Sequence, residues 1–414
     1  MTSVAGATID HIIATTIFLA AMLIFISLFN QTIQTVIIYQ RQKNLAIKCS
    51  DILDNILLNP GFPLEMEGDK PIEWGKRDYS PSVFGLQNPE FTQYRLSPFS
   101  LMRLQSSIRT PVYCTVTNKT YSNITLGFGS YLLVSMDKTI SYDDAAKLLG
   151  VYGMYGFQLT LTPIVNVEIE EANAGDPLSL IIRVTGRGVP LANAEVSYAL
   201  LEVKEDSEGF PTYDMTTGKV QADNMGVLNL NFSSVCTGDS YAFIAYAKAG
   251  GLIGFGCRQR PLGFEAFLVP LVESFNDRRV TVVRNFDLQN ESSTVPFNFT
   301  ASFMYLCEDL TVRRLEGSIY RGNITSINPF ANFTMPKDAG ILVISYKGYY
   351  DVDAVYGITM MPWGINTMAF PVVFGGDVSN SVWVATEIRN VLVGEISYEA
   401  KLAMWNLEGY EVIG

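Results

Sequence analysis

The feature that most constrains this chain is an uncharged apolar run near its start. From Ile12 to Phe29, eighteen consecutive residues carry no charge. As a helix rising about 1.5 Å per residue, the run crosses most of a hydrocarbon core about 30 Å thick. No basic residue precedes it and no A-x-A site follows it, which argues against a cleaved secretory signal. The run therefore predicts a single membrane-spanning helix, with membrane lipid as a partner.

The helical pattern continues beyond the apolar run. Apolar residues recur at steps of three and four between Leu45 and Ile56, and Asn59-Pro60-Gly61 provides a stop signal. We expect one helix from about Thr8 to Leu58, about 75 Å long. Its first half suits lipid, and its second half suits packing on a globular domain.

Asn-X-Ser/Thr triplets indicate export. Seven lie beyond the apolar run and one begins beside it at Asn30, whereas roughly three are expected by chance in such a chain. Each is a potential N-glycosylation acceptor. The seven asparagines are Asn118, Asn123, Asn231, Asn290, Asn298, Asn323 and Asn332. We expect Asn231, Asn298 and Asn332 to face solvent.

The triplets place the bulk of the chain outside the cell. Arg41, Lys43 and Lys48 follow the apolar run, and the positive-inside tendency alone favours the opposite topology. Long domains, however, translocate largely regardless of flanking charge. We therefore expect a single-pass cell-membrane protein with an extracellular ectodomain.

Composition narrows the class of protein. The net charge is −12, which argues against a nucleic-acid partner because a polyanion would be repelled. Charged residues are 17%, aromatic residues 12%, and there are 33 glycines. This composition is typical of β-sandwiches with many turns and not of disordered chains.

The first 75 residues resemble archaeal type IV pilin-like proteins. The resemblance rests on a short leader, the small pair Ala5-Gly6, the uncharged helix, the segment ILLNPGFP at 56–63 and Trp74-Gly75. It implies cleavage by a prepilin peptidase at Ala5 or Gly6, although the leader lacks the Lys or Arg that usually precedes the cut. It also implies that Asp10 pairs with the terminal amine of a neighbouring subunit. A plain signal-anchor helix is the alternative.

The segment from about 159 to 258 resembles the Ig-like repeats of invasins and related surface proteins. Val165 to Glu170 alternates apolar and polar residues, as a half-buried strand does. The segment PLANAEVSYAL at 190–200 and a later Tyr/Ala-rich strand at 241–248 carry the resemblance. It implies a fold and no activity.

We therefore expect a mainly β chain with a long N-terminal α-helix. The expected parts are a transmembrane and amphipathic pilin-like helix at 1–61, a small α+β region at 62–157, an Ig-like β-sandwich at 158–260 and a second β-rich, sandwich-like domain at 261–414. Ser141 to Gly150 predicts a short capped helix. The segment from Glu399 to Leu407 fits either a helix or a strand.

The residues indicate no catalytic chemistry. His11 is the single histidine and lies at the membrane entrance, which practically excludes a His-based triad or zinc site in the ectodomain. We assign no catalytic, cofactor-binding or metal-binding residue and expect no enzyme. Cys236 and Cys257 are the best candidates for a disulfide, and the alternative that they are buried free thiols has equal weight. Cys49 with Cys114 is a weaker candidate pair.

The function expected from these features is structural or adhesive. The chain would be a type IV pilin-like subunit or a component of a pilus-like surface complex, self-associating or binding pilin-like partner subunits. The alternative is a membrane-anchored envelope protein that does not polymerise and presents a sugar- or protein-binding ectodomain.

Overall fold

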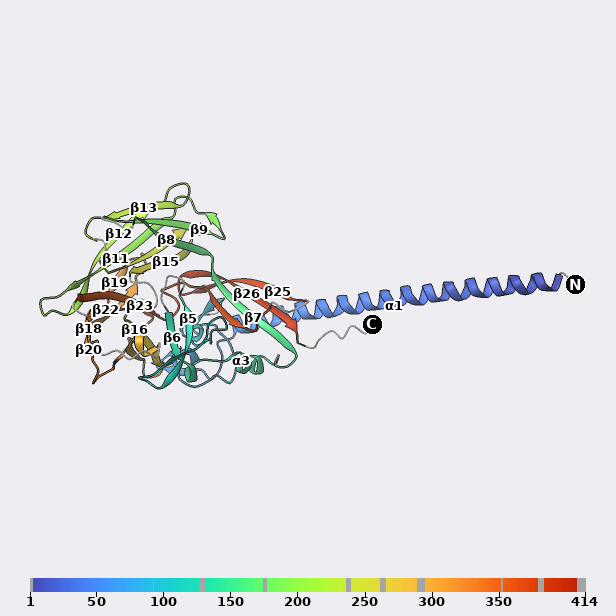
Figure 1. Ribbon diagram of the computed structural model, residues 1–414, viewed down its shortest axis with the longest axis horizontal. Helices are drawn as coiled ribbons and strands as arrows, with labels where there is room; N and C mark the ends of the chain where they lie inside the picture. The colour runs from blue at the N-terminus through green and yellow to red at the C-terminus, as the bar shows by residue number, and fades with distance from the viewer. Residues whose placement is uncertain are drawn as a thin grey trace.

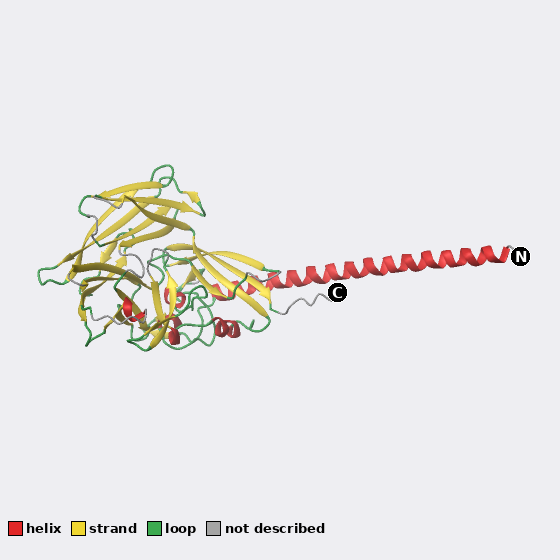
Figure 2. Ribbon diagram, in the orientation of Figure 1, coloured by secondary structure: helices red, strands yellow, loops and turns green. Residues whose placement is uncertain are grey.

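The computed structural model of the chain shows a β-rich head from which one long helix projects (Figure 1). It describes residues 3–91, 93–126, 131–173, 177–235, 240–260, 266–288, 295–350, 353–378 and 383–407. Strands dominate the head, and its other helices are short (Figure 2). The predicted class, mainly β with a long N-terminal helix, is confirmed.

The long helix, α1, runs from Ser3 to Leu58, as its apolar periodicity predicts. It ends where Asn59 Oδ1 accepts a hydrogen bond from Gly61 N at 2.9 Å. Gly61 has φ +79°, and a Cβ atom there would lie 2.6 Å from Trp74 Cδ1. The stop signal therefore combines a turn that favours glycine with a close contact that excludes a side chain.

The segment predicted to be Ig-like forms one eight-stranded sheet folded into two layers. Its order is β10-β9-β8-β15-β14-β11-β12, with β13 beside β9. Phe232 on β13 packs against Tyr198 on β11 and Phe243 on β14, with ring centroids 5.9 Å apart in both pairs, so the two layers share a core. The strands are β8 (Val165–Asn173), β9 (Leu178–Gly186), β10 (Val189–Pro190), β11 (Glu195–Glu205), β12 (Pro211–Gln221), β13 (Val227–Phe232), β14 (Tyr241–Ala249) and β15 (Leu252–Arg260).

A five-stranded sheet holds the C-terminal part of α1. Its order is β24-β7-β26-β25-β3, and α1 packs on β25 and β26. The segment that fitted either a helix or a strand is part of β26. The strands are β3 (Arg95–Leu96), β7 (Tyr155–Pro163), β24 (Val372–Gly375), β25 (Ala385–Val393) and β26 (Ile396–Asn406).

Two further sheets complete the head. The order β21-β17-β16-β6-β5-β4 joins β4 (Val112–Cys114), β5 (Lys119–Thr125), β6 (Tyr131–Ser135), β16 (Leu268–Ser274), β17 (Arg279–Arg284) and β21 (Phe330–Thr334). The order β19-β18-β22-β23, with β20 beside β18, joins β18 (Phe297–Leu306), β19 (Val312–Arg314), β20 (Tyr320–Ile324), β22 (Gly340–Tyr350) and β23 (Asp353–Trp363).

The remaining elements are short. The predicted capped helix is α3, where Ser141 Oγ accepts a hydrogen bond from Asp144 N at 3.2 Å. The others are a β1–β2 hairpin, α2 and three 3-10 turns. Their bounds are β1 (Glu65–Glu67), β2 (Lys70–Ile72), α2 (Pro98–Met102), α3 (Tyr142–Leu148), η1 (Trp74–Lys76), η2 (Met136–Lys138) and η4 (Asn285–Leu288).

The sheets cross the domain boundary that the sequence placed at residue 261. β6, from the region expected to be a small α+β unit, pairs with β16, and β7 pairs with β26 along its whole length. One continuous core also links Leu53 of α1, Ala199 and Ile244 of the two-layered unit, Ile344 of β22 and Leu402 of β26. Some residues after 261 therefore complete sheets begun earlier in the chain, whereas β18, β19, β20, β22 and β23 form a sheet of their own.

Candidate functional site

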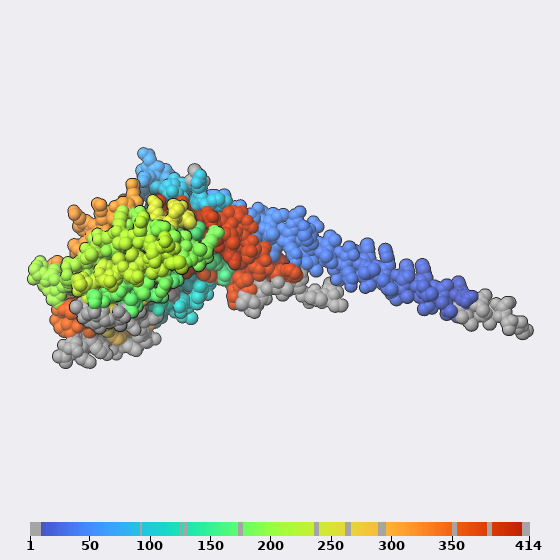
Figure 3. All heavy atoms as spheres, turned by 90° about the horizontal axis from the view of Figure 1, so that it is seen from above, coloured from blue at the N-terminus to red at the C-terminus, as the bar shows by residue number. Residues whose placement is uncertain are grey.

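The projecting part of α1 is an exposed apolar surface. Every residue from Asp10 to Arg41 is exposed. The most apolar window of eighteen residues has a mean hydropathy of 2.6 and none of it is buried, so the helix is long and apolar enough to cross a membrane. Figure 3 shows it leaving the head beside the last strands, which are drawn in red. A surface of this kind requires lipid or another protein to cover it.

The hydroxyl groups along this helix suit an apolar environment. Thr15, Thr16, Thr32 and Thr35 each donate a hydrogen bond to the backbone carbonyl oxygen four residues earlier, at 2.7–2.9 Å. Their polar atoms are therefore satisfied within the helix and place little demand on water.

The predicted processing and assembly residues lie at the far end of α1. Ala5 and Gly6 fall in its first turns, and their side-chain surroundings lie outside the described residues. Asp10 is exposed, while the first helix residue buried against the head is Leu45. The described part of the head therefore offers Asp10 no partner.

The C-terminal part of α1 is fixed to the head. Cys49, Leu53 and Ile56 are fully buried, and Cys49 Sγ lies 3.5 Å from the backbone oxygen of Leu402 on β26. Burial raises the pKa of the Cys49 thiol to about 11. The helix thus projects from a rigid base.

An ion pair reinforces this base. Arg389 on β25 donates to Asp54 on α1, with Nε 3.1 Å from Oδ1 and Nη2 3.3 Å from Oδ2. Its Nη2 also lies 3.1 Å from Ser50 Oγ, and Tyr94 donates to Asp54 Oδ1 at 3.2 Å. Sequence reasoning missed this site because its two ionic partners are 335 residues apart.

The structure places six of the seven glycosylation candidates. Asn231, Asn298 and Asn332 are exposed, as predicted. Asn118, in the turn before β5, and Asn323, on β20, are exposed too. The seventh, Asn290, lies outside the described residues.

The burial of Asn123 argues against its candidacy as a glycosylation site. It is 6% exposed, and its Oδ1 atom has no hydrogen-bond partner in the described structure. It lies opposite Leu133 in the β5–β6 register, on the sheet face that also buries Tyr121. In the folded head this asparagine is therefore inaccessible to a glycan.

The cysteines are free thiols in the described structure. Cys49, Cys114, Cys257 and Cys307 are all unpaired, and Cys236, the predicted partner of Cys257, lies outside the described residues. The weaker pairing of Cys49 with Cys114 is wrong, because these residues belong to separate buried clusters.

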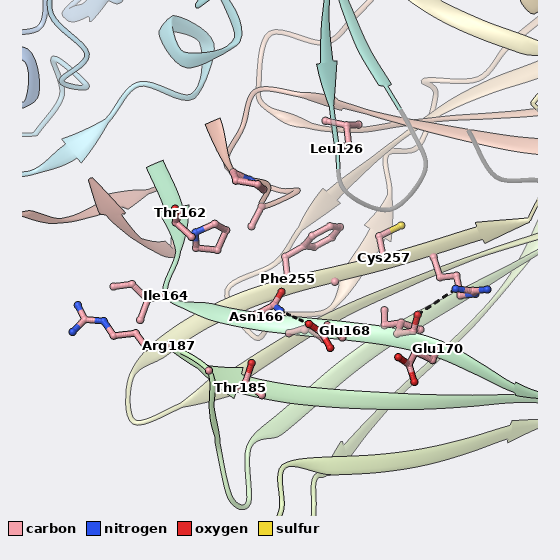
Figure 4. A pocket seen from close by; sticks show the side chains of 18 residues that line it. Leu126, Thr162, Ile164, Asn166, Glu168, Glu170, Thr185, Arg187, Phe255 and Cys257 are labelled. Carbon is pink, nitrogen blue, oxygen red and sulfur yellow. Dashed lines mark hydrogen bonds between the residues drawn. The ribbon is translucent and has the colours of Figure 1, made fainter. Parts of the chain in front are cut away.

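A cleft of about 840 Å³ lies beside β8 and β15, with Leu126 across from them (Figure 4), and Pro371 also lines it. Asn166 Nδ2 donates to Glu168 Oε1 at 2.9 Å within it. Burial raises the pKa of the Cys257 thiol in its lining, so this sulfur is a poor nucleophile. Among the described residues no group of three His, Cys, Asp or Glu could hold a metal ion. We assign no chemistry to the cleft.

Comparison with known proteins identifies no family. No protein-family model and no curated protein matches the chain. Likenesses among solved structures include Escherichia coli alpha-2-macroglobulin (8% identity, TM-score 0.21, 65% of this chain and 19% of that one). Red sea bream transglutaminase gives 12% identity and a TM-score of 0.20 over 67% of this chain and 40% of that one.

A segment of two fibronectin type III domains from chicken tenascin gives 8% identity and a TM-score of 0.15. It covers 49% of this chain and 99% of that one. The chain thus spans about a fifth of the macroglobulin and two fifths of the transglutaminase. Likenesses this weak assign neither a fold family nor a function.

Proposed function

We propose that this protein is a membrane-anchored, pilin-like subunit whose projecting helices pack side by side in a surface assembly. The observation that carries the proposal is the length of the exposed, uncharged part of the helix. Ile12 to Tyr39 spans about 42 Å at a rise of about 1.5 Å per residue, against about 30 Å for a hydrocarbon core. We call the part of this stretch beyond the length of the hydrocarbon core the excess. It includes the exposed side chains of Ile33, Val36, Ile37 and Tyr39.

Lipid alone leaves this excess uncovered. Burial of the helix against the head begins at Leu45, so no part of the described head shields Ile33 or Ile37. Neighbouring copies of the same helix offer matching apolar side chains at 33 and 36–39, beside the polar residues at 30–32, 34 and 35. Packing between helices would bury the excess and stabilise an assembly by about 25 cal/mol per Å² of apolar surface removed from water.

The head suits a structural role outside the cell. The two layers of the 165–260 unit, their shared core and the single parallel pairing of β8 with β15 support an Ig-like assignment. Exposed asparagines in Asn-X-Ser/Thr triplets support an exported, N-glycosylated head. We propose no catalytic activity for the head.

The test compares two changes in the exposed helix. Ile33→Gln with Ile37→Gln removes apolar surface from the excess, and Gln34→Ala is a matched control that removes none. The double variant should stay in the membrane fraction but lose high-mass complexes in native mass analysis and filaments in electron microscopy. The control should keep both.

Two outcomes would oppose the proposal. Assemblies that persist in the double variant would show that the helix excess does not drive association. If the wild-type protein is a monomer in envelope material, the alternative is favoured: a non-polymerising envelope protein with a sugar- or protein-binding ectodomain.

A further inference from the structure

We infer that N-glycans on Asn231, Asn323 and Asn332 cap the free edges of three sheets and prevent strand-to-strand association of the heads. The inference rests on the glycosylated, exported head of the proposed function. It goes beyond that proposal by giving three particular sites a physical role. The three asparagines share one placement: each is exposed on a strand that pairs on one side only.

The pairing of these strands is explicit. Among the described residues, β13, which carries Asn231, pairs only with β9, and β20, which carries Asn323, pairs only with β18. β21, which carries Asn332, ends its sheet beside β17. Figure 1 shows β13 and β20 at separate rims of the head. β20 and β21 lie beside each other, with the ring centroids of Tyr320 and Phe333 5.3 Å apart, so the three sites belong to three sheets but lie at two rims of the head.

Free edges of this length are a hazard for a β-rich head. An edge strand presents unpaired N–H and C=O groups that can add a strand from another chain. Natural proteins block such edges with charges, proline, bulges or covering elements. A glycan on an exposed side chain of the edge strand fills the space beside it and serves the same end.

The remaining long edges are protected by other means. Among described strands of five or more residues, β12 and β23 also pair on one side only. From Gly357 to Trp363, β23 is buried in the head. The exposed half of β12 carries the charges of Asp214 and Lys219. Each of the other three exposed edges carries an Asn-X-Ser/Thr triplet.

Interior strands give a contrast within the same head. Asn298 on β18 lies directly opposite Asn323, with Lys347 of β22 on its other side. Directly opposed side chains have Cβ atoms only about 4.5–5.5 Å apart. One sugar ring fills that space, and Asn323 at the edge is the less crowded acceptor. Asn123, on β5, is buried.

The local contacts leave the acceptor atom available at the third edge. Asn332 accepts a hydrogen bond from Thr281 Oγ1 through Oδ1, at 2.5 Å. The modification uses Nδ2, which forms a bond to the anomeric carbon of a lipid-linked sugar phosphate. The phosphate leaves with the electron pair of the broken bond, Nδ2 loses a proton, and nothing is oxidised or reduced.

The experiment uses the full chain, purified in detergent, in the Ile33→Gln/Ile37→Gln background that removes helix-driven assembly. One triple variant, Ser233→Ala/Thr325→Ala/Thr334→Ala, removes the three acceptor triplets and keeps the asparagines. The matched control, Ser233→Thr/Thr325→Ser/Thr334→Ser, keeps all three triplets. Glycopeptide mass spectrometry measures occupancy, and sedimentation velocity measures association.

We expect glycans on the three edge sites in the background protein and its control. The alanine variant should lose them and show a several-fold larger associated fraction. Replacing the three asparagines by lysine should abolish the glycans but restore dispersed heads, because charge also blocks an edge. This variant separates edge pairing from misfolding, which lysine would not repair.

Two results would overturn the inference. Edge sites that are bare while Asn298 is occupied would show that strand position does not select the acceptors. Occupied edge sites whose loss leaves the heads as dispersed as the control would show that the glycans are not caps. The occupancy result does not depend on whether the helices assemble, and the association result compares variants that share one helix background, so the proposed function is tested separately.

Discussion

Arg389 binds both carboxylate oxygens of Asp54 and so joins the last hairpin of the head to the end of the projecting helix. Nε lies 3.1 Å from Oδ1 and Nη2 lies 3.3 Å from Oδ2. The pair is only partly exposed and flanks the face of α1 that buries Cys49 and Leu53. Its two-bond geometry restricts the direction of the helix more than a single contact would.

Removing this ion pair should loosen the helix from the head. Arg389→Ala should lower the free energy of unfolding by about 1–2 kcal/mol, since two charge-assisted hydrogen bonds at a partly exposed site are lost. Alkylation of Cys49, slow while the thiol is buried with a pKa of about 11, should become faster. Arg389→Lys should recover part of the effect, because lysine keeps the charge without the planar fork.

The control for this prediction is Arg313→Ala, which removes an exposed arginine from β19. Its Cys49 should be alkylated at the wild-type rate. Equal rates in Arg389→Ala and Arg313→Ala would mean that apolar packing alone holds the helix.

Glu73 should make the head less stable as pH rises. Its side chain is buried, with Lys76 Nζ 3.6 Å from Oε1 and no hydrogen-bond partner for Oε2 among the described residues. Burial raises the pKa of this carboxyl above its ordinary value of 4.5. Between pH 4.5 and the pKa of Glu73 in the folded state, the folded protein holds the proton that the unfolded chain has lost. The free energy of unfolding therefore falls as pH rises through this range.

Glu73→Gln removes this titration. The variant should be more stable than the wild type at pH 7, and its advantage should shrink as pH falls toward 4. Denaturant unfolding at several pH values measures both, with Glu316→Gln, at an exposed position, as control. An advantage that stays constant across this range would contradict the assignment to Glu73.

Local signals in the sequence predicted α1 and α3, but they did not predict the short α2 or the pairings between strands far apart in the chain. The three- and four-residue steps before Asn59 and the cap at Ser141 act over one or two turns, so they can be read directly. The partners of β6 and β7 lie more than a hundred residues away, and no local pattern specifies them. The boundary at 261 failed for this reason.

The same distinction applies to the sites. The Asn-X-Ser/Thr motif marks Asn123 and Asn231 equally, because it does not specify which face of a sheet the asparagine side chain will occupy. The burial of Asn123 depends on Leu133 across the ladder and on the covering of that face. Exposure could thus be predicted only where alternation was clear, as it was around Asn231.

Protease shaving tests the proposed topology. Intact cells treated with a protease should release fragments that contain Asn231 and Asn298, because we place everything after about residue 40 outside. Lysed cells provide the comparison. Protection of both segments until lysis would reverse the orientation and favour the basic residues near Arg41 as the topological signal.

A charge in the middle of the apolar run should prevent insertion. Leu23 is exposed on α1 near the centre of the run. Leu23→Arg costs about 2.5–3.5 kcal/mol on insertion scales and should move the protein to soluble or degraded fractions. Leu23→Ile is the control and should remain in the membrane pellet. Retention of the arginine variant there would mean that another segment anchors the chain.

Asp10 separates assembly from insertion. It lies near the end of α1, exposed and beyond reach of the described head, so a stabilising partner has to come from a neighbouring copy. Asp10→Ala should reduce the yield of assembled material and leave membrane retention unchanged, because the substitution removes a charge from the apolar end of the helix. Asp10→Glu should retain part of the assembly, since a carboxylate can still pair with a terminal amine. If processing follows the pilin pattern, assembled material should begin at Gly6 or Ala7 in terminal mass analysis. Normal assembly by the alanine variant would leave the apolar surface of the helix as the sole source of association.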